Sequence, residues 1–142
     1  MRVREANADD APALAALLGE LGYPDDPARV AARAEELARD PASVLLVAED
    51  DRAIVGLASA TTMPLLHEDG SWCRLSALVV AEGRRRGGAG RKLMEEVEAR
   101  AHSRGCRYLE VTSGERAGRE AAHAFYEALG LEQVSRRYLK EL

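Results

Sequence analysis

A strand-like run that passes through a glycine- and arginine-rich turn directly into a helix is the feature that most constrains this chain. The run 73–81 is largely apolar, and residues 83–90 hold four glycines and three arginines. Apolar side chains then recur at helical spacing from Ala89 to Ala101. Free N–H groups at a helix start form an anion site, and glycines let a phosphate approach the backbone. Five positive charges within nine residues make a diphosphate a fitting ligand: Arg84, Arg85, Arg86, Arg91 and Lys92.

Other phosphate-binding patterns fit this turn less well. The nucleoside-triphosphate loop GxxxxGK[ST] is absent, and Leu93 stands where a GxGxxG dinucleotide pattern needs its third glycine. An RNA-binding Arg/Gly tract would be repeated, whereas this turn leads directly into a periodic helix. A solvated basic turn, in which the glycines serve geometry alone, stays open as an alternative.

The composition indicates one globular domain over residues 1–142. Hydrophobic residues make up 46% and charged residues 31%, and the net charge is only −4, which excludes a polycation that coats nucleic acid. No apolar run approaches the ~20 residues of a membrane span. Residues 1–5 lack the apolar core of a signal peptide. From the charge, the lack of a long apolar run and this N-terminus together, we expect a soluble, cytoplasmic protein that binds neither membrane nor nucleic acid. Two cysteines, Cys73 and Cys106, are too few for a disulfide framework.

The order of elements predicts a mixed α/β sheet flanked by helices. Asp9 is expected to cap the first helix, and Asp26 with Pro27 to start the second. Hairpins in the middle of the chain imply antiparallel pairing, whereas strands joined through helices near its end imply parallel pairing. The expected strands are 3–5, 44–48, 53–62, 73–81, 108–112 and 133–139, and the expected helices end near Gly22, Arg39, Gly105 and Gly130.

The same turn resembles the acetyl-coenzyme A signature of the GCN5-related N-acetyltransferase (GNAT) superfamily. The string Arg85–Gly90 matches that signature, [QR]-x-x-G-x-[GA], and residues 122–131 resemble the family's A-x-x-F-Y-x-x-x-G-F element. The likeness covers nearly the whole chain, and residues 119–142 resemble small single-domain members, including the aminoalkylphosphonate acetyltransferases. It implies a mostly antiparallel mixed sheet with splayed fourth and fifth strands.

The resemblance implies an enzyme that transfers an acetyl group from acetyl-coenzyme A to a primary amine of a small molecule or peptide by direct attack on the thioester. Tyr126 would protonate the leaving thiolate, unless it is only a core residue beside Phe125. Glu110 would be the general base, or a solvated strand residue with water in that role. The pyrophosphate would bind the turn, and the pantetheine arm would pair with the preceding strand. The implied coenzyme-binding residues are Leu78, Val79, Val80, Arg85, Arg86, Gly87, Gly88, Ala89, Gly90 and Arg91.

The acceptor site is expected where Tyr23, Glu68 and Arg74 come together, with His67, Asp69 and Trp72 nearby. Its acidic groups favour a cationic acceptor, and Arg74 favours one that also carries a carboxylate or phosphonate. No metal is expected, because the histidines lack ligand spacing, and a homodimer is a possible assembly.

Two other functional classes compete with the enzyme. One is a non-catalytic acyl-coenzyme A sensor, against which the retained Tyr126 argues, and the other is a nucleic-acid module that uses the arginine cluster.

Overall fold

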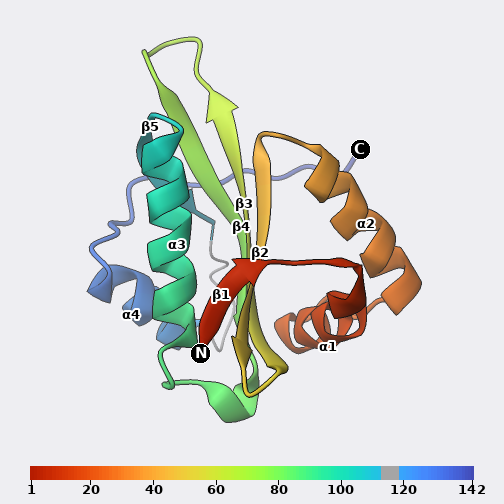
Figure 1. Cartoon of the computed structure of the whole chain (residues 1–142). Coiled ribbons are helices and arrows are strands. Elements are labelled where there is room, and N and C mark those ends of the chain that lie inside the picture. Colours follow the sequence, from red (N-terminus) through yellow and green to blue (C-terminus); the bar gives the residue numbers. More distant parts are fainter. Residues whose placement is uncertain (113–118) are drawn as a thin grey trace. The chain divides into compact units, whose positions relative to one another are not determined.

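A computed structural model describes residues 1–112 and 119–142 (Figure 1). The chain separates into two compact units, Met1–Glu110 and Val111–Leu142. Within the described residues the sheet has the strand order β1-β2-β3-β4-β5. Its strands are β1 (Arg2–Glu5), β2 (Ser43–Asp50), β3 (Ala53–Pro64), β4 (Ser71–Val80) and β5 (Cys106–Val111), and the helices are η1 (Ala8–Asp10), α1 (Ala11–Leu21), α2 (Pro27–Arg39), η2 (Glu82–Arg84), α3 (Ala89–Ser103) and α4 (Glu120–Ala128).

The sheet confirms the expected mixed, mostly antiparallel α/β architecture. Strands β1 to β4 pair antiparallel in sequence order, and β5 lies parallel to β4. Between β3 and β4 the register shifts: Ser59 lies opposite Ala77, but Ala60 lies opposite Leu75. Ser76 is therefore an extra residue in β4, a β-bulge that changes which side chains share a face.

The hydrophobic core lies on both faces of the sheet in the N-terminal unit. Helices α1 and α2 cover one face and α3 covers the other (Figure 1). On the first face Leu14, Leu17 and Val30 pack against strand residues that include Leu57 and Val79. On the second face α3 buries Ala89, Leu93, Met94 and Val97.

A glycine in β3 brings α3 close to the sheet. A Cβ on Gly56 would lie 3.0 Å from the carbonyl oxygen of Val79 and 3.1 Å from Cδ1 of Leu93, so a larger residue would push the helix outward. Leu93 is fully buried at this contact. The close approach fixes the first turns of α3, and with them the glycine-rich turn that precedes the helix.

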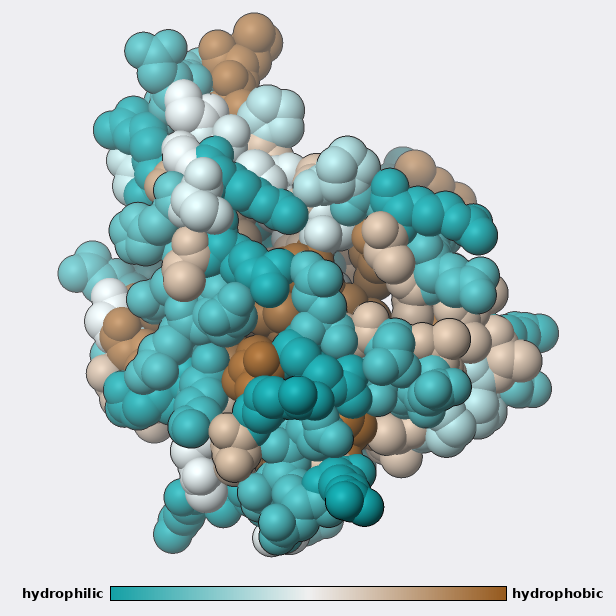
Figure 2. All heavy atoms as spheres, viewed as in Figure 1, coloured by the Kyte–Doolittle hydropathy of each residue, from teal (hydrophilic) through white to brown (hydrophobic). Residues whose placement is uncertain are grey.

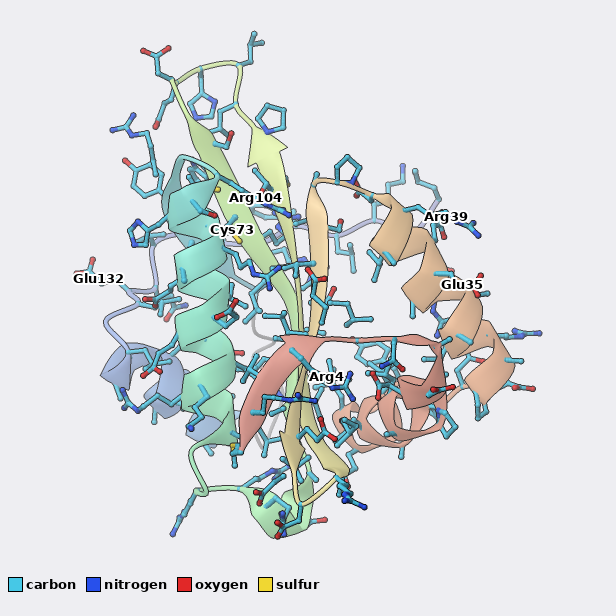
Figure 3. The ribbon with its side chains drawn as sticks, in the orientation of Figure 1. Arg4, Glu35, Arg39, Cys73, Arg104 and Glu132 are labelled. Carbon is cyan, nitrogen blue, oxygen red and sulfur yellow. The ribbon has the colours of Figure 1, made fainter. Side chains whose placement is uncertain are left out.

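The expected Asp9 cap of the first helix is wrong. Asn7 caps η1 instead, and its side chain accepts a hydrogen bond from the Asp9 N–H at 2.9 Å. Asp10 completes this capping box by accepting the Asn7 N–H at 2.8 Å, and Arg4 holds the same carboxylate through two further bonds of 2.8 and 2.9 Å (Figure 3). The start of α1 is thus fixed by an ion pair to β1, which sequence spacing alone does not reveal.

The expected C-terminal strand at 133–139 is also wrong. Within the C-terminal unit, residues 129–142 contain no strand. Val134, Tyr138 and Leu139 are 83%, 87% and 81% exposed. In an extended segment Arg136 would also share a face with Val134 and Tyr138. A strand needs a paired neighbour and an apolar face, and among the described residues of the C-terminal unit this segment has neither.

Surface hydropathy adds one further feature. Hydrophilic side chains cover most of the face in Figure 2, and a hydrophobic patch marks the tip of the β3–β4 hairpin, where Leu66 is fully exposed. Among the described residues, no helix combines the length and the apolar character needed to cross a bilayer.

Candidate functional site

The turn before α3 presents a row of unbonded backbone donors. The first helical hydrogen bond of α3 runs from the Lys92 N–H to the Gly88 carbonyl oxygen at 3.0 Å. The four preceding N–H groups, from Gly88 to Arg91, donate to no acceptor in the described parts of the chain. They stand at the positive end of a 15-residue helix. Such a row of donors can hold an anion.

Local backbone geometry explains why glycine occupies two positions of this turn, Gly87 and Gly88, without any bound ligand. Gly88 has φ +88°, a conformation that L-residues rarely adopt, although a Cβ there would meet nothing within 4 Å. A Cβ on Gly87 would lie 3.2 Å from the Arg84 carbonyl oxygen. Backbone geometry alone therefore accounts for these two glycines, but it does not account for the unbonded donors.

The arginine cluster divides into paired and unpaired side chains. Arg84 forms an ion pair with Asp50 at 2.6 Å, and Arg85 donates through Nε to the Val80 carbonyl oxygen at 3.4 Å. The other three cations are exposed and form no ion pair with any described residue. They are Arg86, Arg91 and Lys92. These three, together with the helix dipole, supply the positive charge around the free donors.

The end of β4 offers only part of the backbone that the sequence assigns to the coenzyme. The Ala81 N–H donates to the Val55 carbonyl oxygen at 2.9 Å. Because backbone groups alternate along an antiparallel pair, those of Val79 also face β3, whereas those of Leu78 and Val80 point away from it. Leu78, through its N–H and C=O, and Val80, through its N–H, can pair with an amide chain, whereas the Val80 C=O already accepts a hydrogen bond from Arg85. Val79 contributes a buried core side chain.

Two of the predicted site residues, Arg74 and Glu110, are paired across neighbouring strands. Nε of Arg74 on β4 donates to Oε1 of Glu110 on β5 at 2.5 Å, and the two side chains are 50% and 26% exposed. Trp72 and Tyr108 lie two residues before them on the same strands and form an edge-to-face pair with centroids 5.3 Å apart. The indole N–H of Trp72 is buried without a partner in the described chain.

Of these four side chains, those of Trp72 and Arg74 face the same side of the sheet as α1 and α2. Thr61 lies opposite Arg74, and the alternation of β3 places Thr61 on the face of Leu57, which packs against α1. The bulge at Ser76 makes this possible, because it changes the alternation of β4 between Ala77 and Arg74. We call Trp72, Arg74, Tyr108 and Glu110 the acceptor patch.

Neither of the other two predicted acceptor residues bonds to Arg74 or Glu110. Glu68, in the β3–β4 loop, accepts a hydrogen bond from Arg107 at 3.1 Å, so a cation already neutralises its charge. Tyr23 follows α1 and is 64% exposed. Its hydroxyl bonds to none of the described residues. The structure thus joins Arg74 with Glu110 and leaves Tyr23 and Glu68 outside the acceptor patch.

Tyr108 was absent from the sequence-based site. The signal that could have found it is the two-residue spacing shared by both strands: an aromatic residue precedes a charged residue by two positions in 72–74 and again in 108–110. On a strand this spacing places both side chains on one face. Arg107 adds a cation over the Tyr108 ring, 5.5 Å from its centroid.

Tyr126 belongs to the C-terminal unit, on α4. Its ring packs edge-to-face against Phe125 with centroids 5.6 Å apart. Burial raises the pKa of the Tyr126 phenol, and the positive charge of Arg119 offsets part of that rise. The phenol therefore keeps its proton at neutral pH, which is the form that a general acid requires.

Cys73 is poorly suited to be a nucleophile. It lies buried on β4 (Figure 3), and this burial raises the pKa of its thiol, with a smaller lowering effect from Arg104. A reactive cysteine needs the opposite shift. In the described residues no group of three or more His, Cys, Asp or Glu side chains is arranged to hold a metal ion.

Solved structures share this fold over nearly their full length. A putative acetyltransferase from Agrobacterium tumefaciens is 23% identical, with complete coverage of both chains and a TM-score of 0.88. A protein described as a transcriptional regulator from Bacillus halodurans is 25% identical, with 99% and 98% coverage and a TM-score of 0.86. The aminoglycoside N-acetyltransferase AAC(6')-Iy in complex with CoA is 19% identical, with 99% and 93% coverage and a TM-score of 0.85. No curated protein matches the chain.

The sequence itself decides the family. The model of the acetyltransferase (GNAT) family matches residues 5–131, a range that includes the turn before α3, Glu110 and Tyr126. The narrower likeness to aminoalkylphosphonate acetyltransferases stays a prediction. Because the family model matches residues 5–131 and the fold is shared, the chain belongs to the GNAT acetyltransferase family.

Proposed function

We propose that this protein is an N-acetyltransferase that uses acetyl-coenzyme A to acetylate a primary amine of a small molecule or peptide. The observation that carries the proposal is the row of four unbonded N–H groups from Gly88 to Arg91, beside three unpaired cations. A diphosphate carries the charge and the acceptor oxygens that such a row can bind. The GNAT family to which the chain belongs uses acetyl-coenzyme A.

The chain's own residues would manage the proton transfers. When bound, the coenzyme supplies a thioester whose carbonyl carbon bonds to the amine nitrogen as the carbon–sulfur bond breaks. An alkylamine with a pKa near ~10 is mostly protonated at pH 7, so Glu110, or water beside it, would first take a proton from the nitrogen. The N–H of Val80, which faces away from β3, would stabilise negative charge on the carbonyl oxygen.

Tyr126 would donate a proton to the departing sulfur. An ordinary phenol pKa of ~10 against a thiol pKa of ~8.5 makes full transfer uphill by roughly 1.5 units, and burial of Tyr126 widens that gap. The phenol would therefore share its proton with the sulfur in the transition state rather than lose it beforehand.

Two measurements test this proposal. Calorimetric titration should show coenzyme A binding at one site, and a thiol-release assay with acetyl-coenzyme A should show turnover with members of a panel of amines and peptides. Absence of coenzyme binding at millimolar concentration would exclude the proposed site. Gel filtration and cell fractionation would test the predicted homodimer and cytoplasmic location.

The second candidate is a non-catalytic acyl-coenzyme A sensor. The Bacillus halodurans neighbour, described as a transcriptional regulator, favours keeping this candidate, because regulation on the same fold needs binding rather than turnover. A sensor would bind the coenzyme but release no thiol with any amine, and Tyr126→Phe would then change neither property.

A further inference from the structure

We infer that Cys73 and Cys106 form a redox-sensitive pair, which a peroxide oxidises to a disulfide that cross-links β4 to β5 beside the acceptor patch. The inference goes beyond acetyl transfer, because it depends on the two thiols and on no coenzyme or amine. The chain has no other cysteine, so one intramolecular pairing is possible.

A threonine on β3 locates the two thiols relative to each other. Sγ of Cys106, on β5, donates a hydrogen bond to Oγ1 of Thr62 at 3.8 Å. Thr62 also lies directly opposite Cys73 on β4, and opposite residues share a face with their Cβ atoms about 4.5–5.5 Å apart. Because β4 lies between β3 and β5, the Cys106 side chain reaches Thr62 across β4, on the face that Cys73 occupies. Both cysteines therefore lie next to the same side chain on one face of the sheet.

The electrostatic surroundings of Cys73 agree with this arrangement. Burial raises the pKa of its thiol, and the negative charge of an ionised Cys106 raises that pKa further. Such an effect between two thiolates falls off with distance, so it requires that they be neighbours. Arg104, at the C-terminal end of α3, lowers the pKa of the same thiol (Figure 3). The pair thus lies on the α3 side of the sheet, opposite the face of Trp72 and Arg74.

The two thiols differ in accessibility, which sets the order of the steps. Cys106 is half-buried, whereas Cys73 is 4% exposed. The Cys106 sulfur attacks the peroxide first: an S–O bond forms, the O–O bond breaks, and a first water leaves. The Cys73 sulfur then attacks the Cys106 sulfur: the S–S bond forms, the S–O bond breaks, and a second water leaves. Two thiols are oxidised to one disulfide while one peroxide is reduced to two waters.

Burial of Cys73 suits the second step and not the first. Its raised pKa makes it slow toward a peroxide in solution. The sulfenic acid of Cys106 would instead form beside it, so the attack is intramolecular and needs no encounter.

The cross-link would act on the acceptor patch through the backbone. Cys73 lies between Trp72 and Arg74, and Cys106 lies two positions before Tyr108. Joining the two cysteines constrains the separation of the two strands that carry the patch. Oxidation therefore changes the surroundings of Trp72, the single tryptophan of the chain, and its fluorescence should report the change.

Thiol counting tests whether the disulfide forms. The full chain is treated with a small excess of hydrogen peroxide and unfolded in urea, and its thiols are then counted with a chromogenic disulfide. We expect two thiols before treatment and none after it, a monomer on a non-reducing gel, a mass lower by two hydrogen atoms, and reversal by dithiothreitol. Retention of both thiols, a disulfide between two chains, or added oxygen without loss of hydrogen would overturn the inference.

Single variants test the two roles. In Cys73→Ala, Cys106 has no partner and should gain oxygen atoms, whereas in Cys106→Ser the buried Cys73 should keep its thiol under the same treatment. The opposite pattern contradicts the proposed order of steps. Cys106→Ser is also the control for fluorescence: Trp72 emission should change reversibly in the wild type and stay constant in this variant, and an equal change in both would exclude the effect on the patch.

The contribution of the fold can be measured in glutathione buffers. The folded protein holds the thiols together, whereas the unfolded chain must first close the loop between residues 73 and 106. The equilibrium constant for disulfide formation should therefore be at least tenfold larger in the folded protein than in urea. An equal or smaller constant in the folded protein would show that the fold does not place the thiols for bonding.

Discussion

The Arg4–Asp10 ion pair should be the most sensitive electrostatic contact of the N-terminal unit. Asp10 is 7% exposed, and its carboxylate accepts two hydrogen bonds from Arg4 and one from the Asn7 N–H. Asp10→Asn keeps the size of the side chain but removes the charge, and it turns an acceptor into a donor that faces the guanidinium. The change tests whether this pair fixes the start of α1.

The expected loss of stability depends on how far Arg4 remains paired once the Asp10 charge is removed. Removing one member of a buried ion pair costs about 3–5 kcal/mol. Arg4 is 23% exposed and keeps Glu49, 3.0 Å from its Nε, so we expect a value below that range, about 2–3 kcal/mol. For a chain of this size each kcal/mol shifts the melting temperature by roughly 3–4 °C, which predicts a fall of about 6–12 °C.

The lowered pKa of Asp10 predicts how the stability difference between wild type and Asp10→Asn changes with pH. The Arg4 guanidinium holds the pKa of Asp10 below its usual value, against an opposing effect of burial. A carboxyl whose folded-state pKa is lowered stabilises the protein fully above its unfolded-state pKa of about 3.9, and loses this effect as the pH falls through the folded-state pKa. The difference between wild type and Asp10→Asn should therefore shrink as the pH is lowered from 5 to 2.

Thermal unfolding followed by circular dichroism at pH 7 and at low pH measures both effects. Asp25→Asn is the control, because Arg33 also lowers the pKa of Asp25 but that pair lies on the surface. Its melting temperature should change little. A loss below about 0.5 kcal/mol for Asp10→Asn at pH 7, or a difference that persists undiminished at low pH, would refute the reasoning.

Three further predictions concern the turn before α3 and the helix α4. Gly88→Val should weaken coenzyme A binding at least tenfold by calorimetry, because a β-branched residue resists φ +88°, whereas Gly83→Ala, in open space, should leave the affinity unchanged. Tyr126→Phe should lower turnover about 10²-fold at neutral pH, and less as the pH rises toward the thiol pKa, with coenzyme affinity unaltered; full turnover would exclude Tyr126 as the acid. Gly130→Val should lower the unfolding midpoint, because φ is +89° there, and an unchanged midpoint would exclude that strain.

Local patterns predicted most of the fold. The helix cap at Asp26, the turn before α3 and the stop at Gly130 depend on residues within a few positions of each other, and all three appear in the structure. At the last of these, the Gly130 N–H bonds to the Glu127 carbonyl and the Leu131 N–H to that of Tyr126, a pairing that ends a helix at a glycine.

Contacts between distant residues could not be predicted in this way. The Arg74–Glu110 pair joins positions 36 residues apart, and the β-bulge that brings Arg74 onto that face follows from the pairing of β3 with β4. The predicted Asp9 cap was wrong because Arg4, on β1, holds the neighbouring Asp10. The strand at 133–139 failed because a strand is defined by its partner, which the sequence of the segment alone does not contain.

The extra residue in β4 has a consequence for how such a chain tolerates change. On the face of the sheet that α3 covers, Leu75 and Cys73 are buried, at 2% and 4% exposure, while Arg74 lies on the opposite face. Because the bulge already leaves Ser76 out of the ladder, deleting this residue would keep Ala77, Leu75 and Arg74 opposite their present partners and on their present faces. Pairing Ser76 with Ala60 would instead shift the register by one residue and exchange the two sets, so that the guanidinium would face α3. The chemistry of this strand therefore depends on its pairing register as much as on side-chain identity. Substitutions along β4 can adjust it gradually, whereas a slip of one residue in the pairing would remove it in a single step.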